Sequence, residues 1–366
     1  MKSIHFQGIA AMSLALAAVA SPAVAQSLSA PSLKQVSTKT VTIAFLLPEN
    51  SSPRYEQMDR PEFTKMVQAL DPNAKLIITN ANSNPSTQLN QAQSAITNGA
   101  QVLVVDPVDG KAGAGIVAYA NRNHVPVLSY DRLIQDSKPA GYVSFDNTKV
   151  GELQGQYIAD HVAPGGSIIM INGAPTDPNA FDFRAGAMSV LTPLVKAGKI
   201  KISYTVMTPD WSPENAFQET QQALTRLDNH VDGVLAANDG TASGAIRALQ
   251  AVGLAGKVPV TGQDATNGGL TYILEGLQSM TVFKYIPDEA AAAAKFAVSL
   301  AVNGTAPAGL VNAHVNNGMI KVPSVLLAPI VVTAQNMGDT VVKSGYATLS
   351  SICVGAATKA PLCQNH

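Results

Sequence analysis

The sequence predicts an α/β protein built from two doubly wound, parallel-sheet domains. Its length of 366 residues corresponds to about two domains. Its apolar runs are continuous rather than alternating, which is typical of strands buried on both faces of a parallel sheet. Amphipathic segments separate these runs, and the alternation of strand and helix restarts part-way along the chain, as two consecutive arrays require.

Residues 1–25 have the features of a secretory signal peptide. A lysine precedes an apolar stretch at 9–20, and Ala23-Val24-Ala25 forms a small-x-small cleavage site. The apolar stretch is shorter than the ~20 residues that a membrane span needs. We therefore expect export with cleavage after Ala25, followed by a flexible lead-in at residues 26–40.

The first array of strands and helices begins at Thr40. Its first helix carries Phe63, Met66, Val67 and Leu70 on one face, and its strands are rich in β-branched residues. The predicted strands are 40–48, 74–80, 101–107 and 125–131, and the predicted helices are 60–71, 86–99 and 111–123.

The second array follows residues 141–147. Its best-signalled helix is 212–227, where Ser212 suits the N-cap and Pro213 suits the first turn. The predicted strands are 166–173, 200–206, 231–239, 257–265 and 278–285, and the predicted helices are 148–162, 183–195, 212–227 and 241–252.

Composition excludes some classes of protein. Hydrophobic residues make up 46% of the chain and charged residues 13%, so a disordered protein is excluded and two cores can be filled. The net charge is −1, with no run of basic residues, which argues against nucleic-acid binding. The two cysteines, Cys353 and Cys363, are expected to form one disulfide, since metal binding has no partner at ligand spacing nearby.

Polar and aromatic side chains follow almost every predicted strand. In doubly wound sheets, ligands bind beyond the carboxyl ends of the strands, so these residues are candidates for a shared cleft. They are Arg54, Tyr55, Asp131, Arg132, Asp177, Asn179, Phe183, Arg184, Trp211, Asn238, Asp239, Gln263, Asp264 and Lys284.

The chemistry of this set suits a sugar. Carboxylates, amides and guanidinium groups make planar hydrogen bonds to hydroxyls around a ring, and flat aromatic side chains cover its apolar faces. Trp211, Tyr55 and Phe183 are the candidates for the faces.

Several of these residues also have a purely structural interpretation. Asp131 and Arg132 could form a structural ion pair, and Trp211 could serve packing alone. We expect Asp239 to cap the helix near Thr241 and Asn238 to face the cleft. Gln263 could hold backbone rather than ligand, and the scattered histidines have no spacing suited to a metal or to catalysis.

Eight segments, taken in order, resemble the periplasmic sugar-binding proteins of ABC importers, which have the type I fold, and most closely the D-xylose-binding branch. The resemblance extends from about Thr42 to Asn303. The segments are RYEQMDRPEF, YDRLI, SFDNTKVGELQ, FRAGAM, DWSPENA, ANDGTASGAI, GQDA and MTVFK.

The resemblance implies two lobes that close around the sugar and are joined by a three-crossing hinge. The N-lobe would take residues 41–146 and 286–315, and the C-lobe residues 147–285 and 316–350, leaving 351–366 as a tail. The implied sugar ligands are Arg54, Tyr55, Asp131, Arg132, Asn179, Arg184, Trp211, Asn238, Asp264 and Lys284, with Asp177 and Phe183 as additional candidates.

The implied ligand is a monosaccharide, D-xylose or a related aldose. Tyr55 stands where the xylose-binding pattern usually has Trp, the loop before it is one residue longer, and Pro178, Phe181 and Tyr285 also depart from the pattern. Arabinose, glucose and galactose therefore stay open. The implied protein is a periplasmic monomer without cofactor or metal, whose partner is an ABC permease or, alternatively, a chemoreceptor or sensor kinase.

Two rival classes lack their required motifs. A dehydrogenase needs a glycine-rich turn after its first strand, and residues 48–56 contain no glycine. Neither a Walker-type loop nor a nucleophile elbow is present, so we expect no enzyme. A sugar-responsive repressor would need an N-terminal helix-turn-helix, and this chain has an export signal there.

Overall fold

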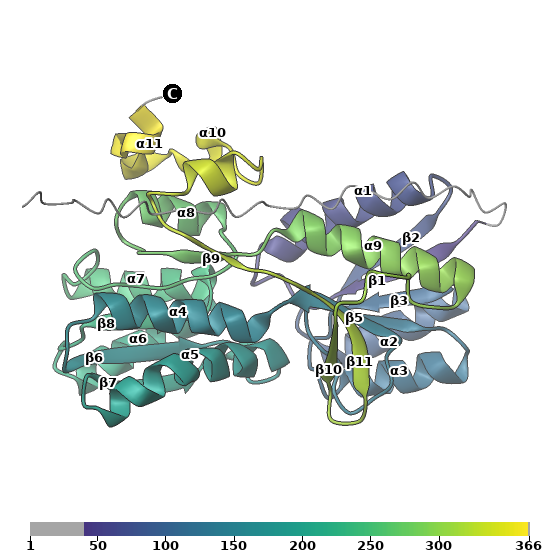
Figure 1. Ribbon diagram of the computed structural model, residues 1–366, viewed down its shortest axis with the longest axis horizontal. Coiled ribbons are helices and arrows are strands. Elements are labelled where there is room, and N and C mark those ends of the chain that lie inside the picture. The colour runs from purple at the N-terminus through teal and green to yellow at the C-terminus, as the bar shows by residue number, and fades with distance from the viewer. Residues whose placement is uncertain (1–39, 365–366) are drawn as a thin grey trace, which may run out of the picture. The chain divides into compact units, whose positions relative to one another are not determined.

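A computed structural model describes residues 40–364. The predicted signal peptide, its cleavage after Ala25 and most of the predicted lead-in lie outside the described residues. Figure 1 labels the helices and strands by their order in the chain.

The first array and two strands from near the C-terminus form a seven-stranded sheet with the order β10-β11-β5-β4-β3-β1-β2. Strands β1 to β5 and β11 pair in parallel, and only β10 is antiparallel to its neighbour. The strands are β1 (Thr42–Leu47), β2 (Lys75–Asn80), β3 (Val102–Val105), β4 (Val127–Tyr130), β5 (Gly141–Phe145), β10 (Ala313–Asn316) and β11 (Lys321–Leu327).

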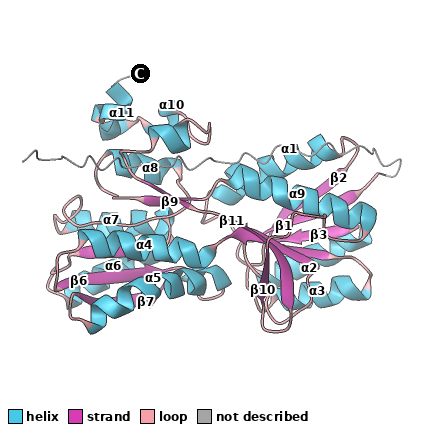
Figure 2. Ribbon diagram, in the orientation of Figure 1, coloured by secondary structure: helices cyan, strands magenta, loops and turns pink. Residues whose placement is uncertain are grey.

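Helices cover both faces of this sheet, as its continuous apolar strands require. One face packs against α1 (Arg60–Leu70) and α9 (Ile286–Asn303), and the other against α2 (Pro85–Thr97) and α3 (Gly113–Arg122) (Figure 2). In β1, Ile43 and Phe45 enter the first of these cores, whereas Ala44 and Leu46 enter the second. The alternation shows that each strand is buried on both sides.

The second array forms a three-stranded parallel sheet with the order β7-β6-β8. One of its faces packs against α6 and α7, and the other against α4 and α5. Its elements are α4 (Asn147–His161), β6 (Gly166–Asn172), α5 (Pro178–Lys196), β7 (Ile200–Met207), α6 (Pro213–Arg226), β8 (Gly233–Ala236) and α7 (Asp239–Ala251). The predicted doubly wound α/β organisation is confirmed.

Single bridges and a short pairing extend the second array. Val234 bridges to Val260 and Gln263 to Val282, and β9 (Thr281–Phe283) pairs with β12 (Ile330–Val332). The helix α8 (Asn267–Leu274) follows Gln263, so residues 260–283 continue the strand–helix–strand pattern beyond β8.

The chain passes between the two arrays three times: from β5 into α4, from β9 into α9, and from β11 into β12. The last passage corrects the predicted division, which assigned residues 316–350 to the second lobe. Ser324 to Leu327 of β11 pair in parallel with Tyr142 to Phe145 of β5. The chain therefore stays with the seven-stranded sheet until Leu327.

The C-terminal residues pack against α8. Cys353 and Cys363 form the predicted disulfide, which joins α10 (Leu349–Ile352) to α11 (Pro361–Gln364). Thr271 of α8 donates its hydroxyl to the Ile352 carbonyl at 3.1 Å. Among residues 40–364, no helix has the length and apolar character needed to cross a bilayer.

Candidate functional site

A small cavity lies where loops from both arrays meet. Its empty space, the mouth included, is about 240 Å³. It is lined by Ser52, Arg54, Tyr55, Asp131, Asp177, Asn179, Phe183, Trp211, Asn238, Gln263, Asp264 and Lys284. Each of these residues follows the carboxyl end of a strand or bridge, which is where doubly wound sheets bind ligands.

Asp131 is the central anion of the cavity. Its carboxylate accepts hydrogen bonds from Arg54 Nη1 and the Tyr55 hydroxyl, both at 3.1 Å, and lies 3.4 Å from Lys284 Nζ. Burial opposes its ionisation, but Arg54, Lys284 and Arg132 outweigh burial and hold the pKa of Asp131 below its usual range. Asp131 is therefore a charged acceptor at neutral pH.

The backbone of Asp131 is held as firmly as its side chain. Its φ of 51° lies in the left-handed region, which is uncommon for non-glycine residues although Asp adopts it more readily than most. Its carbonyl accepts from Tyr142 Oη at 2.9 Å, Ser144 Oγ at 2.7 Å and Asn179 Nδ2 at 3.0 Å. Asn179 belongs to α5, so this carbonyl also joins the two arrays.

Arg54 is anchored from behind. Asp59 receives two hydrogen bonds from Arg54, at 2.7 and 3.0 Å, and Glu289 of α9 receives another at 2.8 Å. Burial opposes the charge of Arg54, but Asp131, Asp59 and Glu289 raise the pKa of its guanidinium well above the usual value. With two carboxylates fixing its other nitrogens, Nη1 is directed at Asp131 before any ligand binds.

Aromatic side chains supply two further walls. Trp211 and Phe183 meet edge to face with ring centroids 6.3 Å apart, and the indole Nε1 donates to Asp177 Oδ2 at 3.0 Å. Gly173 admits the indole, because a Cβ there would lie 2.0 Å from the ring. The Tyr55 ring lies 5.2 Å from the guanidinium carbon of Arg54 and 5.4 Å from that of Arg132.

Two acceptors face the cavity without a hydrogen-bond donor among the described residues. They are Gln263 Oε1 and Asp264 Oδ1, although the latter lies 3.5 Å from Lys284 Nζ. Asp264 has a φ of 93°, and its carbonyl accepts from the Tyr346 hydroxyl at 3.3 Å. Ligand hydroxyls are suitable donors for both oxygens.

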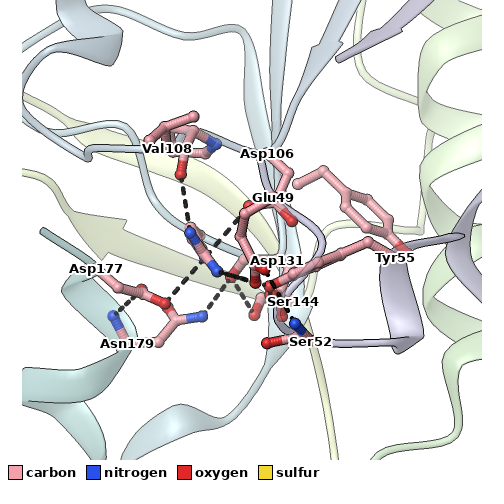
Figure 3. Close-up of polar contacts among 12 residues, drawn as sticks. Glu49, Ser52, Tyr55, Asp106, Val108, Asp131, Ser144, Asp177 and Asn179 are labelled. Atoms are coloured by element: carbon pink, nitrogen blue, oxygen red, sulfur yellow. Dashed lines mark hydrogen bonds and ion pairs between the residues drawn. The ribbon is translucent and has the colours of Figure 1, made fainter. Parts of the chain in front are cut away.

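Arg132, which was predicted as a direct ligand, is not among the residues that line the cavity. It is buried, and its guanidinium lies 2.9 Å from Asp177, 3.3 Å from Glu49 and 3.6 Å from Asp106. Figure 3 shows Glu49, Tyr55 and Asp177 converging in this network. Because Asp177 caps α5, the Arg132–Asp177 contact joins the two arrays.

Arg184 is also absent from the cavity. Asn179 and Phe183 lie four residues apart on α5 and share the face that lines it. Arg184 is one residue further along and is therefore turned about 100° away, on the exposed side.

Asn238 faces the cavity as expected, but the prediction that Asp239 caps the next helix is wrong, because Asn238 is the N-cap of α7. Asn238 lines the cavity, but its Oδ1 also caps α7 by accepting from the Thr241 amide at 2.8 Å. Asp239 begins the helix, and its carboxylate accepts from the Thr266 amide and from Gln278, both at 2.8 Å. Asp239 thereby fixes the turn that follows Asp264.

Two lining residues, Ser52 and Gln263, are absent from the implied sugar ligands. Gln263, which follows the Val260 bridge, was selected by the same strand-end rule as Asp264 but was also given a structural interpretation. Ser52 lies in an irregular loop, where the sequence carries no comparable signal. The other ten predicted residues are brought together.

Comparison with known proteins identifies the family of this chain. Residues 43–305 match the family described as "Periplasmic binding protein domain". The chain belongs to this family. It is 44% identical over 290 residues to the D-xylose-binding periplasmic protein of Escherichia coli, an alignment that covers 79% of this chain and 86% of that protein. It is 42% identical over 296 residues to the protein of the same name from Haemophilus influenzae, covering 81% and 87%.

A solved structure shows the same fold. The carbohydrate transporter solute binding protein of Chloroflexus aurantiacus, in complex with D-glucose, matches with a TM-score of 0.79 and 30% identity. The match covers 86% of this chain and 98% of that one. The predicted type I periplasmic binding fold is confirmed, and these relatives are named for sugar binding or transport rather than catalysis.

Proposed function

We propose that this protein is the substrate-binding component of an ABC sugar importer and holds one monosaccharide in the cavity described above. The observation that carries the proposal is the convergence of Arg54, Asp131 and Lys284 beside Trp211 and Phe183. Charged planar groups and flat rings together match the edge and the faces of a sugar. The D-xylose-binding relatives support D-xylose or a related aldose.

Each lining residue has a chemical role in this proposal. Arg54 and Lys284 donate to ring or hydroxyl oxygens, and Asp131 and Asp264 accept from hydroxyls. Trp211 and Phe183 cover the apolar faces of the ring. Burial strengthens these hydrogen bonds, because the competing solvent is excluded.

Binding is coupled to closure of two lobes. Asp131 follows β4 of the seven-stranded sheet, and Asn179 lies after β6 of the three-stranded sheet. A sugar in the cavity therefore contacts residues from both lobes. Such a ligand favours the closed state over an open one and shifts the population towards it. The permease then recognises the closed surface.

The cellular setting belongs to the same proposal. Export to the periplasm with cleavage after Ala25 agrees with the periplasmic relatives, and we propose a monomer. A chemoreceptor or sensor kinase is the second candidate partner. A relative named as a multiple sugar-binding periplasmic receptor, from Rhizobium radiobacter, is 32% identical to this chain over 323 residues.

Calorimetry with D-xylose, arabinose, glucose and galactose tests the proposal. We expect one aldose to bind and to raise the thermal unfolding midpoint, because a ligand of the folded state alone stabilises it. Absence of binding heat and of any thermal shift with all four sugars would refute sugar binding.

A further inference from the structure

Gly110 lies in the loop between β3 and α3, where this loop touches the start of α5. Its amide donates to the Thr176 carbonyl at 3.0 Å, and its own carbonyl accepts from the Gln135 amide at 2.8 Å. Gly110 and Gln135 belong to the array of the seven-stranded sheet, and Thr176 to the array of the three-stranded sheet. The Gly110 amide therefore makes a direct backbone contact between the arrays.

Pro178 occupies the space that a side chain at position 110 would need. A Cβ there would lie 2.5 Å from Pro178 Cγ and 2.9 Å from Pro178 Cδ, distances that real Cβ atoms essentially never show. The φ of Gly110 is outside the left-handed region, so the backbone would accept alanine. The approach of Pro178, rather than backbone conformation, is what favours glycine at this position.

Two more contacts join the same segment of the second array to the first. Arg132 Nε lies 2.9 Å from Asp177 Oδ2, and Asn179 Nδ2 donates to the Asp131 carbonyl at 3.0 Å. Residues 176–179 thus meet the other array at four consecutive positions, the backbone of Thr176 and the side chains of the next three. Asp131, Asp177 and Asn179 also line the cavity, so this seam sets part of its width.

We infer that Gly110 is a positioning residue for the closed, sugar-bound state, because its missing side chain allows the start of α5 to reach the first array. A Cβ at this position would hold Asp177 and Asn179 away from their partners while touching no lining residue itself. This inference rests on the proposed function, because it requires closure around a sugar.

The test compares four variants of the full-length protein. Gly110→Ala introduces the obstruction, and Pro178→Ala removes the two carbon atoms that it would strike. Gly115→Ala is the matched control, because a Cβ there has no heavy atom within 4 Å beyond its own helix and chain neighbours. The double variant Gly110→Ala/Pro178→Ala restores the space. For each, calorimetry gives the Kd for the aldose that the wild type binds, and small-angle scattering gives the radius of gyration with that sugar.

We expect Gly110→Ala to bind on the order of tenfold more weakly and to be less compact with sugar, as overpacking at a tight contact predicts. Gly115→Ala and Pro178→Ala should stay within about twofold of the wild type, and the double variant should recover most of the affinity. The double variant is needed because the Cβ that Gly110→Ala introduces has a second close neighbour, the Leu133 carbonyl of its own array at 3.2 Å. Only obstruction by Pro178 is relieved in the double variant.

Three results would overturn the inference. Unchanged affinity and compaction in Gly110→Ala would show that closure tolerates a side chain there, and failure of the rescue would assign the loss to Leu133. A fall in the sugar-free unfolding midpoint that Pro178→Ala does not restore would make Gly110 a folding residue. A wild type that binds no aldose would instead defeat the proposed function itself, so the two failures are distinguishable.

Discussion

Replacing Asp131 by Asn tests the electrostatic design of the site. Asn preserves the shape of the side chain and removes the charge that Arg54 and Lys284 share at 3.1 and 3.4 Å. Arg54 keeps Asp59 and Glu289, and Lys284 keeps Asp264 at 3.5 Å. Breaking a buried ion pair costs about 3–5 kcal/mol. Because both cations keep a partner, we expect the lower end, a fall of about 3 kcal/mol in the free energy of unfolding.

Sugar binding should weaken as well. A hydrogen bond to a charged group contributes about 1.5–3 kcal/mol, so loss of the Asp131 carboxylate predicts a Kd roughly 10- to 100-fold higher. Calorimetry and urea unfolding at pH 7 measure the two effects. Asp210→Asn is the matched control, since Asp210 is exposed and has a φ of 57°, close to the 51° of Asp131.

Acidification adds an internal check. The pKa of Asp131 is held below its usual range, because Arg54, Lys284 and Arg132 outweigh the effect of burial. Its stabilising contribution is therefore present above pH ~4 and is lost as the pH falls further. The advantage of the wild type over Asp131→Asn should shrink in that acidic range. Equal Kd and equal unfolding free energy for the two proteins at pH 7 would refute the reasoning.

Two other perturbations should change the stability of the protein. Burial raises the pKa of Asp239 from 3.8 to about 7. Its protonated form therefore stabilises the folded state by roughly 4 kcal/mol at most below pH ~4, and this contribution is lost as the pH rises to 7. Urea unfolding between pH 4 and 8 should show that the free energy of unfolding of the wild type falls with rising pH relative to that of Asp239→Asn. If the two proteins gave parallel curves of unfolding free energy against pH, the expectation would be contradicted. Replacing both Cys353 and Cys363 by Ser should lower stability by up to about 3 kcal/mol, because the closed loop is short. The sugar Kd should stay within about twofold, since Tyr346 contacts Asp264 upstream of the disulfide; a large rise in Kd would contradict this.

The strand-end rule predicted most of the site because parallel strands deliver their carboxyl ends to one edge. Asp131, Trp211 and Lys284 lie far apart in the chain. Asp131 and Lys284 directly follow β4 and β9, Trp211 lies in the turn after β7, and the fold alone brings them together. The rule gives position along the chain and not side-chain direction. Arg132 follows Asp131 but turns to carboxylates from three other loops, which local sequence does not encode.

Arg184 was named because it follows a strand and because the resemblance implied it, and neither ground fixes the helix face on which its side chain lies. The apolar spacing predicted a helix from Phe183, whereas α5 begins at Pro178 with Asp177 as its N-cap. The pair Asp177-Pro178 is a recognised start signal, an N-cap acid followed by proline in the first turn. With that start, Asn179 and Phe183 fall on one face and Arg184 on another.

No strand was predicted at β11, which contains Pro323. A proline within an apolar run argues against a central strand, since it cannot donate to the neighbouring strand. In the structure, Pro323 lies opposite His314 of β10, and the parallel pairing with β5 begins only at Ser324. The proline is tolerated because it precedes the doubly paired part of the strand.

The polar groups that line the cavity fall into two classes with different consequences for affinity. Arg54 is fully engaged by Asp59 and Glu289, so its orientation is fixed before a ligand arrives and little ordering entropy is lost on binding. Gln263 Oε1 and Asp264 Oδ1, in contrast, accept no hydrogen bond from the described residues. An unsatisfied buried acceptor destabilises the folded protein by about 1–3 kcal/mol, and a ligand hydroxyl that donates to it removes this cost. Part of the sugar affinity should therefore originate in instability of the ligand-free site, so that Gln263→Leu should stabilise the free protein while it weakens binding.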